Sequence, residues 1–206
     1  MMEVNARVVK ELREKTGAGV MDCKKALAET QGDLEKAVVW LREKGIAQAA
    51  KRAGRVASEG SVGAYIHAGG KLGVLVEVNC ESDFVARHED FQKLVKEIAM
   101  QIAAANPRCV RREELTPEVV ELERQIYATQ SAGKPDNILS KIVEGKLEKF
   151  YKEVCLLEQS WVRDPNRTIT DLIGEYFAKF KEKIEVRRFV RYQLGEGLDG
   201  RTAPEA

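Results

Sequence analysis

The sequence lacks an excess of charge of either sign. Its 34 basic and 33 acidic residues leave a formal net charge of +1. A balance so close to neutrality creates no general field that would attract nucleic acid or an anionic membrane. We also find no secretory signal peptide and no apolar run of membrane-spanning length. We therefore expect a cytoplasmic protein that recognises its partner by local shape, without membrane contact and without nucleic acid as its ligand.

The sequence also has few residues suited to metal or nucleophilic chemistry. Its cysteines are scattered, with none of the C-x-x-C spacing of zinc and redox sites: Cys23, Cys80, Cys109 and Cys155. The two histidines, His67 and His88, have no second pair of ligands at a recognised spacing. A Cys80–His88 pair is disfavoured because Cys80 lies on an apolar strand face, where a thiolate is costly. We predict no metal site and buried, reduced thiols.

Nucleotide-binding motifs are incomplete. The stretch Thr16–Gly19 lacks the third glycine of a dinucleotide fingerprint, and Gly70–Lys71 lacks both the upstream glycine and the following Ser or Thr of a phosphate loop. Carboxylates stand in helical ion-pair spacing, as in Glu11 and Lys15, which is typical of solvated helix faces. The sequence therefore predicts no catalytic residues, no cofactor and no direct nucleotide binding.

The clearest pattern that is present lies in Gly73–Phe91. Its first half alternates with period two, which predicts a strand whose apolar face carries Val74, Val76, Val78 and Cys80. Apolar residues then recur at helical spacing, at Phe91, Leu94, Val95, Ile98 and Ile102. Ser82–Arg87 is thus predicted to be a corner between a strand and a helix.

The predicted corner places Asp83 and Phe84 between two rigid elements. Such a corner presents an apolar ring and a neighbouring anion to a partner with little entropy left to lose. The alternative interpretation is that Phe84 caps the core of its own domain, as an aromatic residue at the end of a strand often does.

Three short helices are predicted before residue 55. Gly17–Gly19 ends the first, Gly32 ends the second, and the third begins at the N-cap Asp33 and ends at Gly45. The loop Ala18–Met21 carries small and apolar residues that helical periodicity does not require, either as a docking face or as a loop anchor. Ile46–Arg55 follows as a short helix or stiff basic linker.

Strands precede and follow the remaining helices. A hairpin is predicted at Gly69–Gly70, and a last strand at Ile184–Leu194 with a bulge or edge position at Arg188. Between these strands, the helix after the corner is predicted to end at Asn106–Pro107. Three further helices are predicted to begin at Thr116–Pro117, near Asp136 and at the cap Thr170. The fold class is α+β: a three-helix bundle followed by a small antiparallel sheet with helices packed on one face. The expected domains are residues 1–55, 56–195 and a flexible tail at 196–206.

Four stretches resemble one known family. They are CESDFVAR at Cys80–Arg87, KELREKTGAGVMDCKKAL at Lys10–Leu27, IVEGKLEKFY at Ile142–Tyr151 and VRRFVRYQLG at Val186–Gly195. Together they are similar to bacterial elongation factor Ts over nearly the whole chain. Ser82 stands where that family has threonine, which keeps the hydroxyl group.

This resemblance implies a fold and a function. The first three helices would be a module like the ubiquitin-associated domain. The chain would promote guanine nucleotide exchange on elongation factor Tu, with Phe84 as a wedge in its GTPase domain and Asp83 on the same surface. The wedge would disturb magnesium and phosphate binding. Arg13, Val20 and Met21 would grip another helix of that domain, and Val20 gives a shorter contact than the methionine that is frequent there.

Members of this family commonly carry two related halves in the core, whereas this chain has one copy of GVLVEV. The resemblance to the short form with a single core module implies a homodimer and a two-to-two complex with elongation factor Tu. The final strand is a candidate for self-contact, although its mixture of apolar and basic residues equally suits packing within one subunit.

Two other functions are compatible with the pattern. A dimeric adaptor could bind helical or ubiquitin-like partners through the three-helix module, and it would depend on Met21 and not on Phe84. A protein that binds tRNA or the ribosome through Lys44–Arg55 would show steep salt dependence.

Overall fold

The computed structural model describes residues 5–51, 54–133 and 135–197. Arg52 of the basic linker and most of the expected tail lie outside these residues. The described residues form both helices and strands, with helices first and a small antiparallel sheet after them. The expected α+β fold class is therefore confirmed. None of the described helices is long and apolar enough to cross a membrane.

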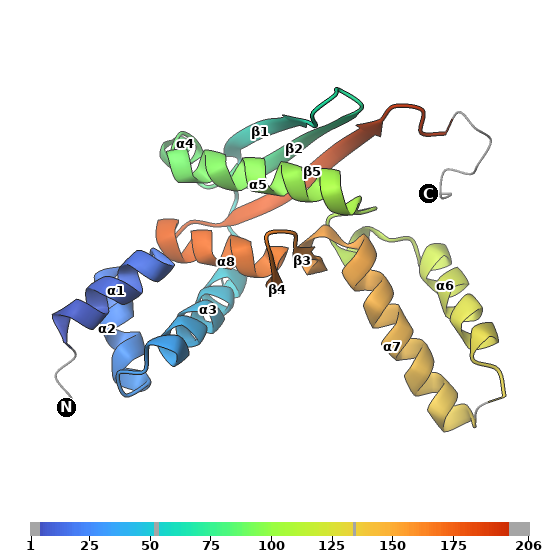
Figure 1. Ribbon diagram of the computed structural model, residues 1–206, viewed down its shortest axis with the longest axis horizontal. Coiled ribbons are helices and arrows are strands. Elements are labelled where there is room, and N and C mark those ends of the chain that lie inside the picture. The colour runs from blue at the N-terminus through green and yellow to red at the C-terminus, as the bar shows by residue number, and fades with distance from the viewer. Residues whose placement is uncertain (1–4, 52–53, 134, 198–206) are drawn as a thin grey trace. The chain divides into compact units, whose positions relative to one another are not determined.

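The first three helices form a small bundle (Figure 1). They are α1 (Ala6–Thr16), α2 (Val20–Glu29) and α3 (Leu34–Lys51). Their shared core buries Leu12, Cys23, Ala26 and Leu27 completely. Gly17 ends α1 in the left-handed region at φ 67°, where glycine carries no steric cost. Asp33 precedes α3 and accepts a hydrogen bond from the Lys36 backbone N–H at 3.0 Å, as predicted for an N-cap.

The predicted end of the third helix at Gly45 is wrong, because α3 continues to Lys51. Gly45 is buried, and a Cβ atom there would lie 3.2 Å from the backbone oxygen of Gly174 in α8 (Ile169–Phe180). The missing side chain therefore serves a close contact between two helices and does not end one of them.

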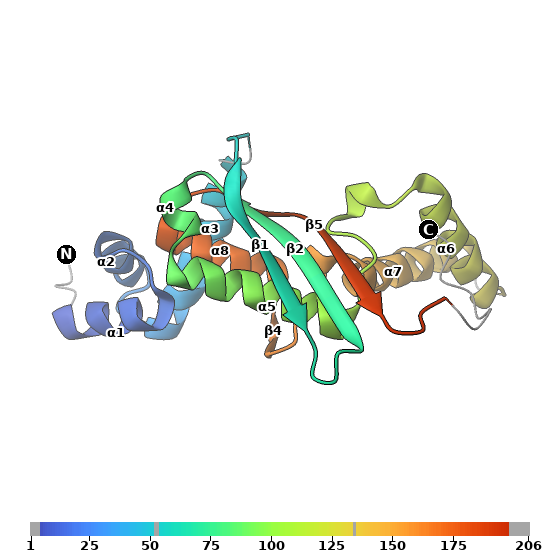
Figure 2. The same cartoon turned by 90° about the horizontal axis from the view of Figure 1, so that it is seen from above.

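A three-stranded sheet follows in the order β1 (Glu59–Ile66), β2 (Leu72–Cys80) and β5 (Ile184–Gln193). Figure 2 shows the strands crossing α5 (Glu89–Ala105), which covers one face. The predicted apolar faces meet there: Val74, Val76, Val78 and Cys80 of β2 and Phe91, Leu94, Val95, Ile98 and Ile102 of α5 are all at most 2% exposed. The strand β5 is at an edge, as expected, and its alternation breaks at Arg187 and Arg188, both of which are exposed.

The middle of the chain forms a helical hairpin of α6 (Pro117–Gln130) and α7 (Asp136–Val154). The start of α6 at Pro117 and the start of α7 at Asp136 agree with the predictions. The sequence interpretation missed four short elements that carry little periodicity: η1 (Arg112–Glu114), η2 (Leu156–Glu158), β3 (Ser160–Trp161) and β4 (Asp164–Thr168). The corner helix α4 (Asp83–Ala86) completes the elements.

By its internal contacts the chain divides into two interleaved units. The first contains the described residues up to Val62, Glu77–Val95 and Thr170–Val186, and therefore holds both the helical bundle and the corner. The second contains Gly63–Val76, Lys96–Ile169 and the described residues from Arg187 onward. The division of domains at residue 55 remains a prediction.

Candidate partner-binding site

The corner between β2 and α5 is built on Ser82. This residue is extended at φ −130° and ψ 152°, and its Oγ accepts a hydrogen bond from the backbone N–H of Val85 at 3.3 Å. It therefore caps α4, a helix of four residues that could not form alone. The backbone N–H of Arg87 donates to the Asp83 carbonyl oxygen at 3.1 Å and closes the turn.

This turn separates neighbouring side chains. Phe84 is 77% exposed, whereas Val85 is 4% and Ala86 is 7% exposed. The interpretation of Phe84 as a core residue is therefore wrong, and its ring projects into solvent. Asp83, also exposed, forms an ion pair with Arg87 at 3.2 Å. Because both groups are largely solvated, this pair is weak and leaves the carboxylate available to a partner.

A second apolar projection lies at the start of α2. Met21 is 74% and Val20 is 42% exposed, and Arg13 of α1 is also exposed. Ala18 in the same loop is 1% exposed, and its carbonyl oxygen accepts from the Cys23 thiol at 3.7 Å. The two interpretations of this loop thus apply to different residues: Ala18 is the anchor, and Val20 with Met21 forms the projecting face.

The four cysteines are buried and none of them forms a disulfide bond. Burial, followed by the charge of Glu182, raises the pKa of Cys80 to about 11, and its thiol donates to the Ser82 carbonyl oxygen at 3.2 Å. Nδ1 of His88 accepts from the Asp90 backbone N–H at 3.1 Å, at the start of α5. Cys80 and His88 are therefore engaged with separate local partners. Among the described residues, no three His, Cys, Asp or Glu side chains are grouped to hold a metal ion.

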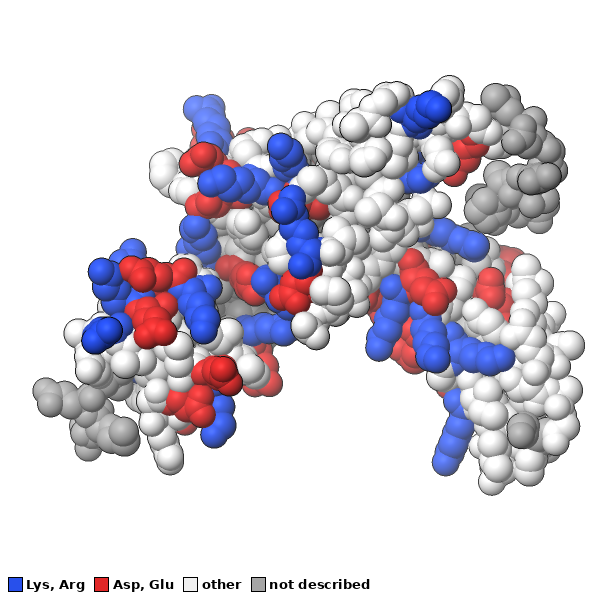
Figure 3. Space-filling view, viewed as in Figure 1, with Lys and Arg blue, Asp and Glu red and all other residues white. Residues whose placement is uncertain are grey.

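The basic segment considered for nucleic acid makes local contacts. Nζ of Lys44 lies 4.3 Å from the centre of the Trp40 ring, and Nη1 of Arg55 lies 2.9 Å from Oε2 of Glu81. On the face drawn in Figure 3, basic and acidic side chains are interspersed. Of the cations in this segment whose side chains the structure describes, Lys44 and Arg55 are therefore engaged with neighbours in their own chain.

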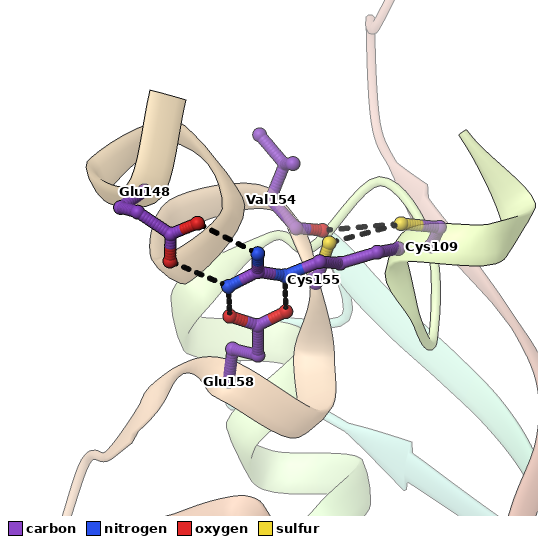
Figure 4. A network of polar contacts seen from close by, with 6 residues as sticks. Cys109, Glu148, Val154, Cys155 and Glu158 are labelled. Carbon is purple, nitrogen blue, oxygen red and sulfur yellow. Dashed lines mark hydrogen bonds and ion pairs between the residues drawn. The ribbon is translucent and has the colours of Figure 1, made fainter. Parts of the chain in front are cut away.

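Sequence reasoning missed an ionic cluster at the base of the α6–α7 hairpin (Figure 4). The guanidinium of Arg112 donates to both oxygens of Glu148 at 2.8 Å and also pairs with Glu158. These hydrogen bonds, first to Glu158 and then to Glu148, raise the pKa of Arg112 above its ordinary value. The partners are 36 and 46 residues away in sequence, so no local pattern could have indicated them.

The fold and the two projections define a class of protein. It is an α+β binding protein that presents an aromatic ring on a capped corner and an apolar tip on a helical bundle. Both groups are costly to leave in water unless a partner covers them.

Comparison with known proteins identifies the family. The family model described as Elongation factor TS matches residues 3–196. The chain is 61% identical to Elongation factor Ts of Desulforamulus reducens over 98% of this chain and 94% of that relative. It is 61% identical to the Geobacter metallireducens protein of that name, over 96% and 92%, and 60% identical to that of Thermoanaerobacter sp., over 95% and 97%. The chain therefore belongs to the elongation factor Ts family and is a translation elongation factor.

Proposed function

We propose that the chain promotes GDP release from elongation factor Tu by inserting Phe84 into its GTPase domain. The single observation that carries this proposal is the ring of Phe84, 77% exposed on a capped corner beside the exposed Asp83. A GTPase holds its nucleotide through a phosphate loop and a bridging magnesium ion. A wedge that shifts either element weakens the contacts of both, and GDP dissociates faster.

Linkage limits what this mechanism can do. If the chain lowers the affinity of elongation factor Tu for GDP, GDP must lower the affinity for the chain by the same factor. The chain therefore accelerates exchange without selecting a nucleotide, and the excess of GTP sets the outcome. No nucleotide, metal or cofactor needs to bind to the chain itself.

The wedge is tested by stopped-flow release of fluorescent GDP from elongation factor Tu. We expect Phe84→Ala to slow stimulated release about 30-fold, because truncation of an aromatic anchor costs about 2 kcal/mol. Val56→Ala is a matched control, since Val56 is 81% exposed and lies in the same unit. Release that is equally fast with Phe84→Ala would contradict the proposal, provided circular dichroism shows an intact fold.

We assign Arg13, Val20 and Met21 to a separate anchoring contact. Truncation of Met21 should raise the concentration of chain that gives half-maximal stimulation and leave the saturating rate nearly unchanged. The rival function, an adaptor for helical or ubiquitin-like partners, requires Met21 and is indifferent to Phe84. The two variants in one assay therefore separate these functions.

We further propose that the chain is a homodimer that binds two molecules of elongation factor Tu. The support is the sheet face opposite α5, which carries exposed apolar side chains at alternate positions. Within the second unit these are Ala64 and Ile66 of β1, Leu75 of β2, and Val190, Tyr192 and Leu194 in and after β5. A second copy of the same face would cover this surface through an isologous contact.

A further inference from the structure

The end of α8 and its continuation into β5, Lys179–Lys183, contacts three other elements of the first unit. Lys179 pairs with Asp90 at the start of α5. Nζ of Lys181 lies 2.7 Å from Oδ2 of Asp22 in α2. The carboxylate of Glu182 accepts two hydrogen bonds from Ser82, from Oγ at 2.6 Å and from the backbone N–H at 3.0 Å. One short segment therefore reaches the element that carries Met21 and the cap that supports Phe84.

Glu182 is placed to decide the geometry of the corner. Ser82 is the last residue before α4, and α4 is too short to hold its own conformation. Hydrogen bonds to a carboxylate are about twice as strong as those between neutral groups. Both groups are half-buried, which reduces competition from water. The neighbouring Glu81 contributes a second link, since its Oε1 accepts from the backbone N–H of Lys183 at 2.7 Å.

Lys181 turns the chain between the ion pair of Lys179 and the hydrogen bonds of Glu182. It is a non-glycine residue in the left-handed region at φ 59°, and its backbone N–H donates to the Phe177 carbonyl oxygen at 2.8 Å to end α8. Such a conformation is uncommon and is kept where the surroundings require it. Its side chain reaches Asp22, the residue immediately after Met21.

The helical bundle also meets α8 elsewhere. The buried Gly45 approaches Gly174 closely enough that a Cβ atom would lie 3.2 Å from its carbonyl oxygen. Arg42 pairs with Asp171, which is 8% exposed. The bundle is thus held to α8 by the close approach at Gly45 and by the ion pair of Asp171, and to the segment after α8 by the ion pair of Asp22.

We propose that Lys179–Lys183 is a frame that fixes the separation between the Phe84 ring and the Met21 tip, with Glu182 as the positioning residue of the corner. This inference rests on the proposed function, because it states how the two contact groups act together. When the Phe84 ring and the Met21 side chain are held at a fixed separation, they bind a partner as one rigid unit. Once the first contact forms, the second then requires no further loss of conformational entropy.

The geometry is tested directly by electron–electron double resonance. Nitroxide labels at Lys24→Cys on α2 and Arg87→Cys on the corner report the distance between α2 and the corner. Both positions are exposed. We expect one narrow distance distribution in the otherwise unchanged chain and a broad one after Glu182→Ala. Glu43→Ala, which removes an exposed glutamate of α3, should leave the distribution narrow. An equally narrow distribution after Glu182→Ala overturns the frame.

Exchange kinetics supply the second readout. With Glu182→Ala the saturating rate of GDP release should fall about fivefold, which is the effect expected when one ordered group becomes mobile. The concentration of chain that gives half-maximal stimulation should change by less than about twofold. An unchanged saturating rate overturns the positioning role. If the unchanged chain does not stimulate release at all, the proposed function fails, and the distance distributions still decide the frame.

A charge exchange covers the case in which Glu182→Ala fails to fold. Lys181→Glu should broaden the distance distribution, because it places a second carboxylate next to Asp22. Asp22→Lys combined with Lys181→Glu restores a pair of opposite charges and should narrow the distribution again. A purely structural loss at Lys181 would not be rescued by the second substitution. Absence of rescue therefore counts against the frame.

Discussion

Phe84 and Val85 are neighbours in the sequence, yet their side chains are 77% and 4% exposed. Full burial of a phenylalanine side chain contributes about 1.5 to 3 kcal/mol, so this fold leaves a substantial hydrophobic contribution unused at one position. The cap at Ser82 makes this separation possible, because it begins a turn in which only Val85 and Ala86 face the core. At the residue scale, the proposed binding contact and a packing contact thus lie at adjacent positions.

The thiols give a prediction at the same scale. Burial raises the pKa of all four, of Cys155 to about 12 and of Cys80 to about 11, so alkylation of the folded protein by iodoacetamide at pH 8 should be slow. A thiol whose pKa is raised by folding stabilises the native state below its unfolded pKa, near 9, and that contribution is lost as the pH rises toward 11 or 12. For Cys80 and Cys155 we expect the free energy of unfolding to fall by about 1 kcal/mol per thiol between pH 8 and pH 10.

Urea unfolding at the two pH values measures this loss, and mass spectrometry counts the alkylated cysteines. Cys155→Ala serves as the comparison, since lysine and tyrosine titrations are common to both proteins. The free energy of unfolding of Cys155→Ala should depend less on pH than that of the unchanged chain. An identical pH dependence would contradict the assignment to the thiols.

Elements with a strong period could be predicted from the sequence. Period two placed the valines of β2 on the buried face, helical spacing placed Phe91 and Ile98 of α5 against it, and Thr116–Pro117 marked the start of α6. The strands β3 and β4 escaped because one has two residues and the other, with sequence DPNRT, has neither apolar alternation nor high strand propensity. The contact of Glu182 with Ser82 joins residues 100 apart, which local patterns cannot indicate.

Two glycines lead to opposite predictions at the scale of an element. A Cβ atom at Gly60 would lie 2.2 Å from the Val78 carbonyl oxygen, and φ is 144°, so Gly60→Ala must displace β1 from β2. We expect a loss of about 2 kcal/mol or more in the free energy of unfolding. The matched variant Gly145→Ala lies in open space within α7 and should add about 0.5 to 1 kcal/mol.

Thermal unfolding by circular dichroism measures both variants. The midpoint for Gly60→Ala should fall by roughly 4 to 8 °C for a chain of this size, and that for Gly145→Ala should rise slightly. If the two substitutions shifted the midpoint equally, the close approach at Gly60 would have no energetic significance.

At the scale of the whole molecule, the face of the sheet away from α5 is the proposed contact between two copies of the chain. Tyr192 and Leu194 are 72% and 74% exposed there. Tyr192→Lys should place a charge within the contact between two copies and convert a dimer into a monomer, because an unpaired buried charge is costly. Sedimentation equilibrium measures the mass, and Val162→Lys, which changes another exposed apolar residue of the second unit, is the control.

The stoichiometry with elongation factor Tu should change with the assembly. The unchanged chain is expected to give a two-to-two complex, and Tyr192→Lys a one-to-one complex. A monomeric mass for the unchanged chain at micromolar concentration would contradict the dimer, whatever the mass of the variant.

The left-handed backbone of Lys181 has a practical consequence for protein engineering. Glycine at this position would relax the main chain and at the same time remove the cation that reaches Asp22, so the two effects on the melting temperature oppose each other. Where the two effects cancel, a screen that ranks variants by melting temperature alone accepts Lys181→Gly, although the cation that pairs with Asp22 of α2 is gone. In this chain the melting temperature thus reports the main chain and the side chain of Lys181 together, whereas the link to Asp22 depends on the side chain alone.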